Sequence, residues 1–395
     1  TFPPQQSVTV WVVPTIASFT GKLEGDGTER KLLLNWKTTD TDYVTASWTD
    51  EELDANPPQP YTISPPFGKT YAITAHAGHG PKSKPAVLQQ DYTLSDTIPV
   101  GETPYNVAIT PDGTLGLVAN ISSCSVSVID LKERKVIYTI SIEKTDRGLG
   151  GLAITPDGNL AFVGNFNERI SVINIKERKV IKKITIKGQR GAPWIAITPD
   201  GKLAFVMSYT KQRVSVIDTQ KQTLSHTIPI LDDVYGVAIT PDGNLAFVGT
   251  AGGVTVIDVK TMKISNGISL EDGAKKVAIT PDGTLAFVTN NEAKSVVVID
   301  IKKQTVSKTI PVGMATFPIG ITSNGNYALV GANNANKVVL IDIEKLAVVS
   351  IIVCPGSYGL KGLAITPDDS LVFLAPVGND STVGLLQQEY KLVSS

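Results

Sequence analysis

The sequence predicts an all-β protein built mostly from one repeated four-stranded unit. The phrase Ala-Ile-Thr-Pro-Asp-Gly, a two-residue spacer ending in Leu, and then Ala-Phe-Val recurs along the chain, with its Thr at 110, 155, 198, 240, 280, 322 and 366. No window of ten or more residues has a helical apolar period bounded by caps. Because a period near 42 residues is typical of one propeller blade, seven copies predict a seven-bladed β-propeller.

Each unit resolves into four short strands separated by turns. In the fifth copy we expect these strands at Lys276–Thr280, Leu285–Asn290, Val296–Ile301 and Thr305–Pro311. The third of them alternates with period two and is rich in β-branched residues, which indicates a half-buried strand.

The Thr-Pro-Asp-Gly phrase predicts the hairpin turn between the first and second strands. Pro presets φ at the first central position, Asp tolerates the second, and Gly adopts the positive φ that follows. Two copies depart from the phrase, since Thr322 opens Thr-Ser-Asn-Gly and Thr366 opens Thr-Pro-Asp-Asp.

A recurrent acid ends most of the third strands, and its repetition favours a structural role over a catalytic one. At this position a carboxylate is expected to accept backbone N–H groups of the next turn. Asn174 replaces the acid in the second copy, and the acids themselves are Asp130, Asp218, Asp258, Asp300 and Asp342.

A closed ring needs a strand that joins its ends. Asp91–Gly101 matches Gln304–Gly313, which belongs to the fourth strand of a blade, yet it precedes the first full copy. We expect this segment to supply the outer strand of the last blade; the alternative is the tail, Tyr390–Ser394. Closure would remove exposed strand edges.

Within this repeat, Phe287-Val288-Thr289-Asn290 in a unit that ends Val-Ile-Asp and Thr-Ile-Pro-Val-Gly resembles the YVTN-type β-propeller repeat. That family includes bacterial periplasmic propellers and archaeal surface-layer propellers. The resemblance covers about three quarters of the chain and implies the fold and an extracellular, cell-surface or periplasmic location. It implies little about function, because the motif residues form the scaffold.

Residues 1–90 predict a separate β-sandwich, and residues 91–395 the propeller. The front segment contains six or seven short strands spaced by turns. The order Ser-Phe, Leu-x-Trp, Tyr-x-Ile-Thr-Ala resembles bacterial Ig-like domains, and without Cys its core must depend on Trp36 and its neighbours. The strand-like segments are Pro14–Phe19, Leu32–Trp36, Tyr43–Trp48, Tyr61–Ile63, Thr70–Ala75 and Pro85–Leu88.

Composition argues against several classes of partner. The net charge of −1 gives no bulk electrostatic reason to expect nucleic acid or an anionic membrane. The longest apolar stretch, Leu346–Cys354, is nine residues, far short of the ~20 that a membrane helix needs. The basic run Glu177–Arg190 alternates with apolar residues, which favours a solubilising strand edge over a nucleic-acid surface. The chain starts at Thr1, which fits either a removed signal or a fragment.

No linear motif for catalysis, for a cofactor or for a metal is present. His76 and His79 are the only close histidine pair, and no Cys, Asp or Glu lies near them in sequence to complete a zinc site, so we expect a solvated hairpin loop. We expect Cys124 in a loop of the first blade and Cys354 at the end of a strand that leads into the seventh. Ring closure brings these blades near one another, but two separate thiols are favoured over a disulfide.

Candidate ligand-binding residues come from the loops that join fourth to first strands and second to third strands. These loops form one face of a propeller, here called the loop face, and they vary most between copies. Aromatic and Arg residues around one rim are typical of a recognition surface. For any single residue, however, the favoured interpretation is that it covers the hydrophobic end of a blade. The candidates are Tyr105, Arg147, Phe166, Arg169, Arg190, Trp194, Tyr209, Arg213, Tyr235, Phe317 and Tyr358; the same loops carry Asp232, Asp233, Lys275, Lys276 and Lys361.

Two functions fit this sequence. The first is a non-catalytic binding or scaffold protein of the cell envelope or exterior that recognises a protein or glycan through the loop face. The second is a propeller enzyme, lactonase-like or lyase-like, with a site at the channel mouth assembled from scattered residues. A cluster of charged side chains with perturbed pKa values at the channel would favour the enzyme.

Overall fold

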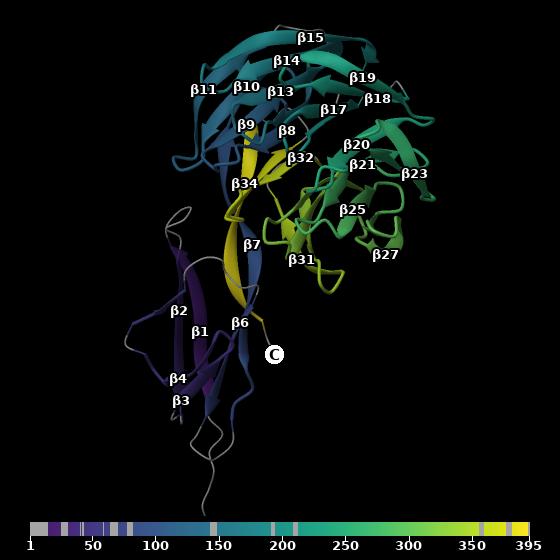
Figure 1. Cartoon of the computed structure of the whole chain (residues 1–395). Coiled ribbons are helices and arrows are strands. Elements are labelled where there is room, and N and C mark those ends of the chain that lie inside the picture. Colours follow the sequence, from purple (N-terminus) through teal and green to yellow (C-terminus); the bar gives the residue numbers. More distant parts are fainter. Residues whose placement is uncertain are drawn as a thin grey trace, which may run out of the picture. The chain divides into compact units, whose positions relative to one another are not determined.

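The computed structural model describes residues 15–24, 31–39, 41, 43–57, 59–63, 70–76, 82–142, 148–190, 194–207, 212–354, 359–376 and 381–393. These residues form strands β1 to β34 and no helix (Figure 1), which confirms the all-β prediction. Within them, accordingly, no helix could cross a membrane. The chain divides into one compact unit of residues 1–93 and 388–395 and a second of residues 94–387.

The first unit consists of two groups of paired strands around one core. Trp36 and Phe19 from the first group pack with Tyr71 and Ile73 from the second, and the Trp36 indole donates a hydrogen bond to the Asp54 carbonyl at 3.1 Å. Trp36 is thus a core residue, as expected. One group has the order β1 (Thr15–Glu24), β2 (Lys31–Thr39), β5 (Tyr61–Ile63); the other has the order β7 (Ala86–Pro99), β6 (Thr70–His76), β3 (Tyr43–Ala46), β4 (Thr49–Asp54).

The second unit contains six four-stranded antiparallel sheets whose strands pair in chain order, first to fourth. In Figure 1 the fourth strands β11, β15, β19, β23 and β27 lie on the outside of this unit. The strands of the six sheets are β8 (Pro104–Ile109), β9 (Leu115–Asn120), β10 (Ser125–Asp130), β11 (Lys135–Ser141); β12 (Leu149–Ile154), β13 (Leu160–Asn165), β14 (Asn167–Asn174), β15 (Lys179–Arg190); β16 (Trp194–Ile197), β17 (Leu203–Met207), β18 (Arg213–Asp218), β19 (Thr223–Pro229); β20 (Val234–Ile239), β21 (Leu245–Thr250), β22 (Gly253–Asp258), β23 (Lys263–Ser269); β24 (Val277–Ile279), β25 (Leu285–Asn290), β26 (Ser295–Asp300), β27 (Thr305–Pro311); β28 (Thr316–Ile321), β29 (Tyr327–Ala332), β30 (Lys337–Asp342) and β31 (Ala347–Val353).

The last strands pair in the order β32 (Leu360–Ile365), β33 (Leu371–Pro376), β34 (Thr382–Val393), β7. The strand outside β34 is therefore β7, from the segment Asp91–Gly101, and not the tail. Here Val100 N–H donates to the Ser381 carbonyl at 2.8 Å. The first strands also contact one another in sequence, β8, β12, β16, β20, β24, β28 and β32, and β32 contacts β8. The first strands therefore form a closed ring.

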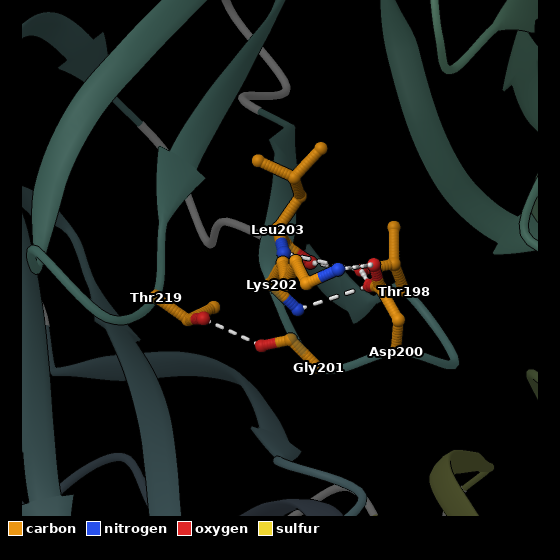
Figure 2. A network of polar contacts seen from close by, with 6 residues as sticks. All are labelled: Thr198, Asp200, Gly201, Lys202, Leu203 and Thr219. Atoms are coloured by element: carbon orange, nitrogen blue, oxygen red, sulfur yellow. Dashed lines mark hydrogen bonds and ion pairs between the residues drawn. The ribbon is translucent and has the colours of Figure 1, made fainter.

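The Thr-Pro-Asp-Gly turns have the predicted geometry, which Figure 2 shows for one copy. The Thr198 hydroxyl donates to the Asp200 carboxylate at 2.6 Å and accepts from Leu203 N–H at 3.1 Å. Gly201 has a φ of +73°. The hydrogen bond from Thr198 is the main cause that holds the pKa of Asp200 below its usual value. Each turn thus fixes its own carboxylate, so these acids are structural.

The acids at the ends of the third strands also behave as expected. Asp130 accepts from Glu133 N–H at 2.9 Å, and Asn174 accepts from Glu177 N–H at the same distance. Asp258, Asp300 and Asp342 accept from the N–H three residues later in the same way. Their repetition reflects one turn geometry used several times.

The turn glycine of one sheet faces the turn proline of the preceding sheet. A Cβ at Gly201 would meet Pro156 Cδ at 3.3 Å, and a Cβ at Gly113 would meet Pro367 Cδ at 3.5 Å. The second contact joins the first sheet to the last, so the contacts between turns also continue around the closed ring.

The two copies that depart from the phrase compensate for each other. Ser323 stands where the other copies have Pro, and Asp369 stands where they have Gly, with a φ of +59°. The buried Asp369 carboxylate accepts from Ser323 N–H at 2.6 Å and from Asn324 N–H at 3.1 Å, while the Ser323 hydroxyl donates to the Pro367 carbonyl at 2.6 Å. Proline has no N–H, so the acid depends on the serine.

Replacing Ser323 with Pro should therefore lower the melting temperature. The change removes a donor from a buried carboxylate, which costs about 1–3 kcal/mol. Adding Asp369→Gly recreates the Pro–Gly contact of the other sheets, so the double variant should melt closer to the wild type than Ser323→Pro alone. Thermal unfolding followed by circular dichroism measures this coupling, and strictly additive losses would contradict it.

Candidate functional site

A cavity of about 430 Å³ lies on the loop face of the second unit. It is within the usual size range of small-molecule sites, about 300–1,000 Å³. Its lining residues come from the starts of first strands and from loops between second and third strands, at the end of the strands opposite the Thr-Pro-Asp-Gly turns. The lining residues are Tyr105, Phe166, Trp194, Tyr235, Lys275, Asn291, Glu292, Phe317, Asn333 and Lys361.

Several lining side chains stand on β-bulges in the first strands. The register shifts at Tyr105 in β8, at Tyr235 in β20 and at Lys361 in β32, and it shifts across Phe317 and Pro318 in β28. A bulge adds a residue that pairs with no partner and re-aims its side chain. The repeated strand thus carries, at one position, a side chain that the ladder does not constrain.

Three aromatic rings from different sheets meet at the cavity. The ring centroids of Tyr105 and Trp194 are 5.6 Å apart, and those of Trp194 and Phe317 are 5.8 Å apart. These separations are typical of interacting aromatic pairs. We call these three residues the aromatic cluster.

Three lysines lie against aromatic rings that line the cavity. Lys276 Nζ lies 2.6 Å from the Trp194 ring centroid and 5.4 Å from that of Phe317. Lys361 Nζ lies 4.5 Å from the Phe317 centroid, and Lys275 Nζ lies 3.8 Å from that of Tyr235. All three are half-buried, with their charge against ring faces. We call them the pocket lysines.

Burial lowers the pKa of each pocket lysine. The pKa of Lys276 falls well below its usual value, first because of burial and then because of the positive charge on Lys361. Burial alone lowers the pKa of Lys361. The charges of Glu292 and Asp233 partly offset the effect of burial on the pKa of Lys275. Among the described residues, carboxylates therefore affect the pKa of Lys275 and not that of Lys276 or Lys361.

Hydrogen bonds hold the lysine backbone and one lysine side chain in place. The buried Thr289 hydroxyl accepts from Lys276 N–H at 3.0 Å and donates to the Phe317 carbonyl at 3.1 Å. Lys361 Nζ donates to the Asn333 side-chain oxygen at 2.6 Å, and the Asn333 amide donates to Asn291 at 3.1 Å. Thr289 thus links two neighbouring first strands, and the two asparagines orient Lys361.

Glycine at 236 makes room for Lys276. A Cβ at this position would meet the Lys275 carbonyl oxygen at 2.5 Å and Lys276 Cδ at 3.1 Å. Real Cβ atoms essentially never approach backbone so closely, so the lysine side chain can pass only because β20 carries no side chain here.

Five of the candidates from sequence come together at this cavity: Tyr105, Phe166, Trp194, Tyr235 and Phe317. Arg213 lies elsewhere, since it begins β18 and donates to the Lys187 carbonyl. Arg169 is a strand residue of β14 and does not line the cavity; Arg190 ends β15, and its side chain lies outside the described residues. Arg147, Tyr209 and Tyr358 also lie outside the described residues.

Sequence reasoning missed Asn291, Glu292 and Asn333, which line the cavity from loops between second and third strands. Their common signal is position: Asn291 and Asn333 directly follow a second strand, and Glu292 is one residue further on. Short polar residues are frequent in turns for local reasons, which is why nothing in the sequence singled them out.

Other candidates have local explanations. The His76 ring stacks on Tyr43 with centroids 4.7 Å apart and bonds the Thr45 hydroxyl at 2.9 Å; His79 lies outside the described residues. In the described part of the chain no group of three or more His, Cys, Asp or Glu could hold a metal. Cys124 and Cys354 are buried and form no disulfide, and burial raises the pKa of Cys354 to about 12.

A second cavity, of about 450 Å³, lies at the opposite end of the strands. Its lining includes the turn residues Pro111, Asp112, Pro156 and Asp157. Since Asp112 and Asp157 already accept hydrogen bonds within their own turns, this cavity is a by-product of the repeat.

The ring of sheets and the cavity on its loop face define a β-propeller. The chain belongs to the YNCE-like beta-propeller family, whose profile matches residues 83–367. None of the curated proteins compared with the sequence matches it.

Two solved structures share the propeller fold at low sequence identity. One is Kuenenia stuttgartiensis hydrazine synthase, at 21% identity and a TM-score of 0.62, covering 74% of this chain and 96% of that one. The other is the Myceliophteria thermophila Cps50 (Swd1) beta-propeller domain, at 11% identity and a TM-score of 0.66, covering 75% of this chain and 99% of that one.

Replacing Lys276 with Met should stabilise the protein. The depressed pKa means that the folded state disfavours the ammonium form, and exchanging a buried charge for an apolar side chain gains about 1–4 kcal/mol, at the low end here because the side chain is half-buried. This gain should be largest at acidic pH and shrink as the pH rises towards the usual lysine pKa, where the unfolded chain also loses the proton. Thermal melts across pH test this, with exposed Lys303→Met as control; no gain at any pH would contradict it.

Proposed function

We propose that this chain is a non-catalytic binding protein of the cell envelope or exterior, and that it recognises a glycan through the loop face. In this proposal the propeller has seven blades, each built on one of the seven first strands, with β7 completing the last. The front unit is an Ig-like sandwich that acts as a spacer. The YVTN-type resemblance supports the location.

The observation that carries this proposal is the concave aromatic site. Five aromatic side chains from different sheets line one cavity. Sugar rings present apolar C–H faces that stack on aromatic rings, while amide and ammonium groups bond their hydroxyls. Asn291, Asn333 and Lys361 supply such groups beside the rings.

The shape of the site favours a glycan over a folded protein. A stable protein interface covers about 800 Å² on each partner and is usually flat. A 430 Å³ cavity suits one or two sugar residues or a short chain passing through. A folded protein partner captured without glycan would overturn this choice.

Glycan binding should perturb Trp194, the only tryptophan of the chain beyond residue 90. After a glycan array has identified a ligand, titration should change the tryptophan fluorescence of the wild type. Trp194→Ala should lose at least tenfold in affinity, because truncating a central aromatic commonly costs 2 kcal/mol or more, which is about thirtyfold. Trp48→Phe, in the other unit, is the matched control, and equal losses from both variants would count against the site.

A propeller enzyme of the lactonase or lyase kind is the second candidate. The observation in its favour is Lys276, whose amine lies against the Trp194 ring at the cavity and whose pKa burial lowers, so that it gives up its proton more readily than an exposed lysine. Kuenenia stuttgartiensis hydrazine synthase, by its name an enzyme, shares the fold, but fold alone does not fix function.

The enzyme hypothesis predicts that the protein converts a substrate and that the rate depends on Lys276. Incubation with uronate polysaccharides and with lactones should produce, respectively, ultraviolet absorbance from a new double bond or release of acid. Lys276→Met should reduce the rate by about 100-fold or more, the usual contribution of a general base, whereas Lys303→Met should not. Binding without product formation would favour the non-catalytic proposal.

A further inference from the structure

The pocket lysines divide into two groups by their surroundings. The Glu292 and Asp233 charges act on Lys275. Lys276 and Lys361 instead flank the Phe317 ring, both within 5.4 Å of its centroid. In the described part of the chain no carboxylate forms an ion pair with either of them. The cavity therefore has a balanced side and a side with uncompensated positive charge.

The neighbours of Lys276 and Lys361 give only weak compensation. Lys361 Nζ donates to the neutral Asn333 oxygen, which leaves two of its three protons for another acceptor. The Lys276 ammonium lies against the Trp194 ring. Partial burial removes water from both groups, and the two positive charges repel each other. An anion beside them would supply acceptors and cancel this repulsion.

We infer that the glycan bound at this cavity is acidic, with a sugar carboxylate held by the side chains of Lys276 and Lys361 and the sugar ring against the aromatic cluster. This inference rests on the proposed function and names its ligand class. The lysines flank the same ring that the sugar would stack on, and the carboxylate of a uronic acid projects from the edge of its ring. One residue of such a glycan can therefore meet both requirements.

Single-stranded nucleic acid offers the same chemistry of rings and anions, but the cavity favours the sugar acid. A nucleic acid chain is held by a long basic groove that follows successive phosphates. Here the positive charge is confined to one cavity, and the net charge of the chain is −1. A single carboxylate matches this local charge.

The test compares a galacturonate trimer with its methyl ester, which keeps the sugar and removes the charge. The acid should bind the full chain about tenfold more tightly, as one charge-assisted contact allows, with calorimetry as the readout. Lys361→Met should weaken binding of the acid more than binding of the ester, so that the tenfold difference between the two ligands is lost. Lys303→Met is the exposed control and should change neither.

Four outcomes would overturn the inference. Equal binding of acid and ester, or tighter binding of neutral glycans on the array, would leave the proposed function standing without an acidic ligand. Equal weakening of acid and ester by Lys361→Met would show that the lysine only supports the pocket. Absence of all glycan binding would refute both proposals, and tight, steeply salt-dependent binding of a single-stranded oligonucleotide would replace the sugar acid with nucleic acid.

Discussion

Each four-stranded sheet of this protein has two apolar faces and cannot bury either of them alone. The second strands show this most clearly, since Phe162, Phe205, Phe247, Phe287 and Phe373 are all fully buried. Each hydrophobic cluster of the second unit combines two neighbouring sheets; Met207 and Val216, for example, pack with Ala246 and Val248. Stability therefore resides between sheets, and the arrangement is complete only when the last sheet meets the first. Ile98 and Phe373 do so by packing with Val107 and Val118.

This constraint also couples neighbouring turns to one another. Adjacent turns touch through Pro and Gly around the ring, so a change at one turn alters the surroundings of the next. Ser323 and Asp369 replace one such Pro–Gly pair with hydrogen bonds. Taken alone, each residue is a departure from the Thr-Pro-Asp-Gly sequence. Taken together, the two residues connect adjacent turns in a different way from the Pro–Gly contact. Such coupling between residues of adjacent turns follows from the closed ring of sheets, and it cannot be recognised from the sequence of a single repeat.

The sequence was sufficient for the all-β fold because the period, the turn phrase and the alternation of the strands all depend on local chemistry. It also identified the strand that lies outside β34, since Asp91–Gly101 repeats the pattern of a fourth strand. It was less informative about the cavity. Tyr105, Tyr235 and Phe317 could be proposed because they break the repeat with large rings. Arg213 breaks it too, but its guanidinium donates to the Lys187 carbonyl of β15, in the preceding sheet. Whether a residue that departs from the repeat lines the cavity depends on the β-bulges. A bulge is a property of the pairing between strands and is not written in any one strand.

In the first strands, the position at which the repeats differ in sequence is the one that strand pairing does not constrain. Four residues before the Ile that ends each first strand, the sheets carry Tyr105, Gly150, Tyr235, Lys275, Phe317 and Lys361. The bulges free such residues from the ladder, so they can change without disturbing the buried faces.

The following position holds Trp194 and Lys276 in two sheets and glycine in three, Gly151, Gly236 and Gly362. Because first strands approach closely, a large side chain at this position needs a small neighbour, as Gly236 is for Lys276. Among the described residues Lys276 has no ion pair, and a half-buried lysine of this kind weakens the fold. Its place against the Trp194 and Phe317 rings is a feature that the proposed ligand would account for and that the ring of sheets does not require.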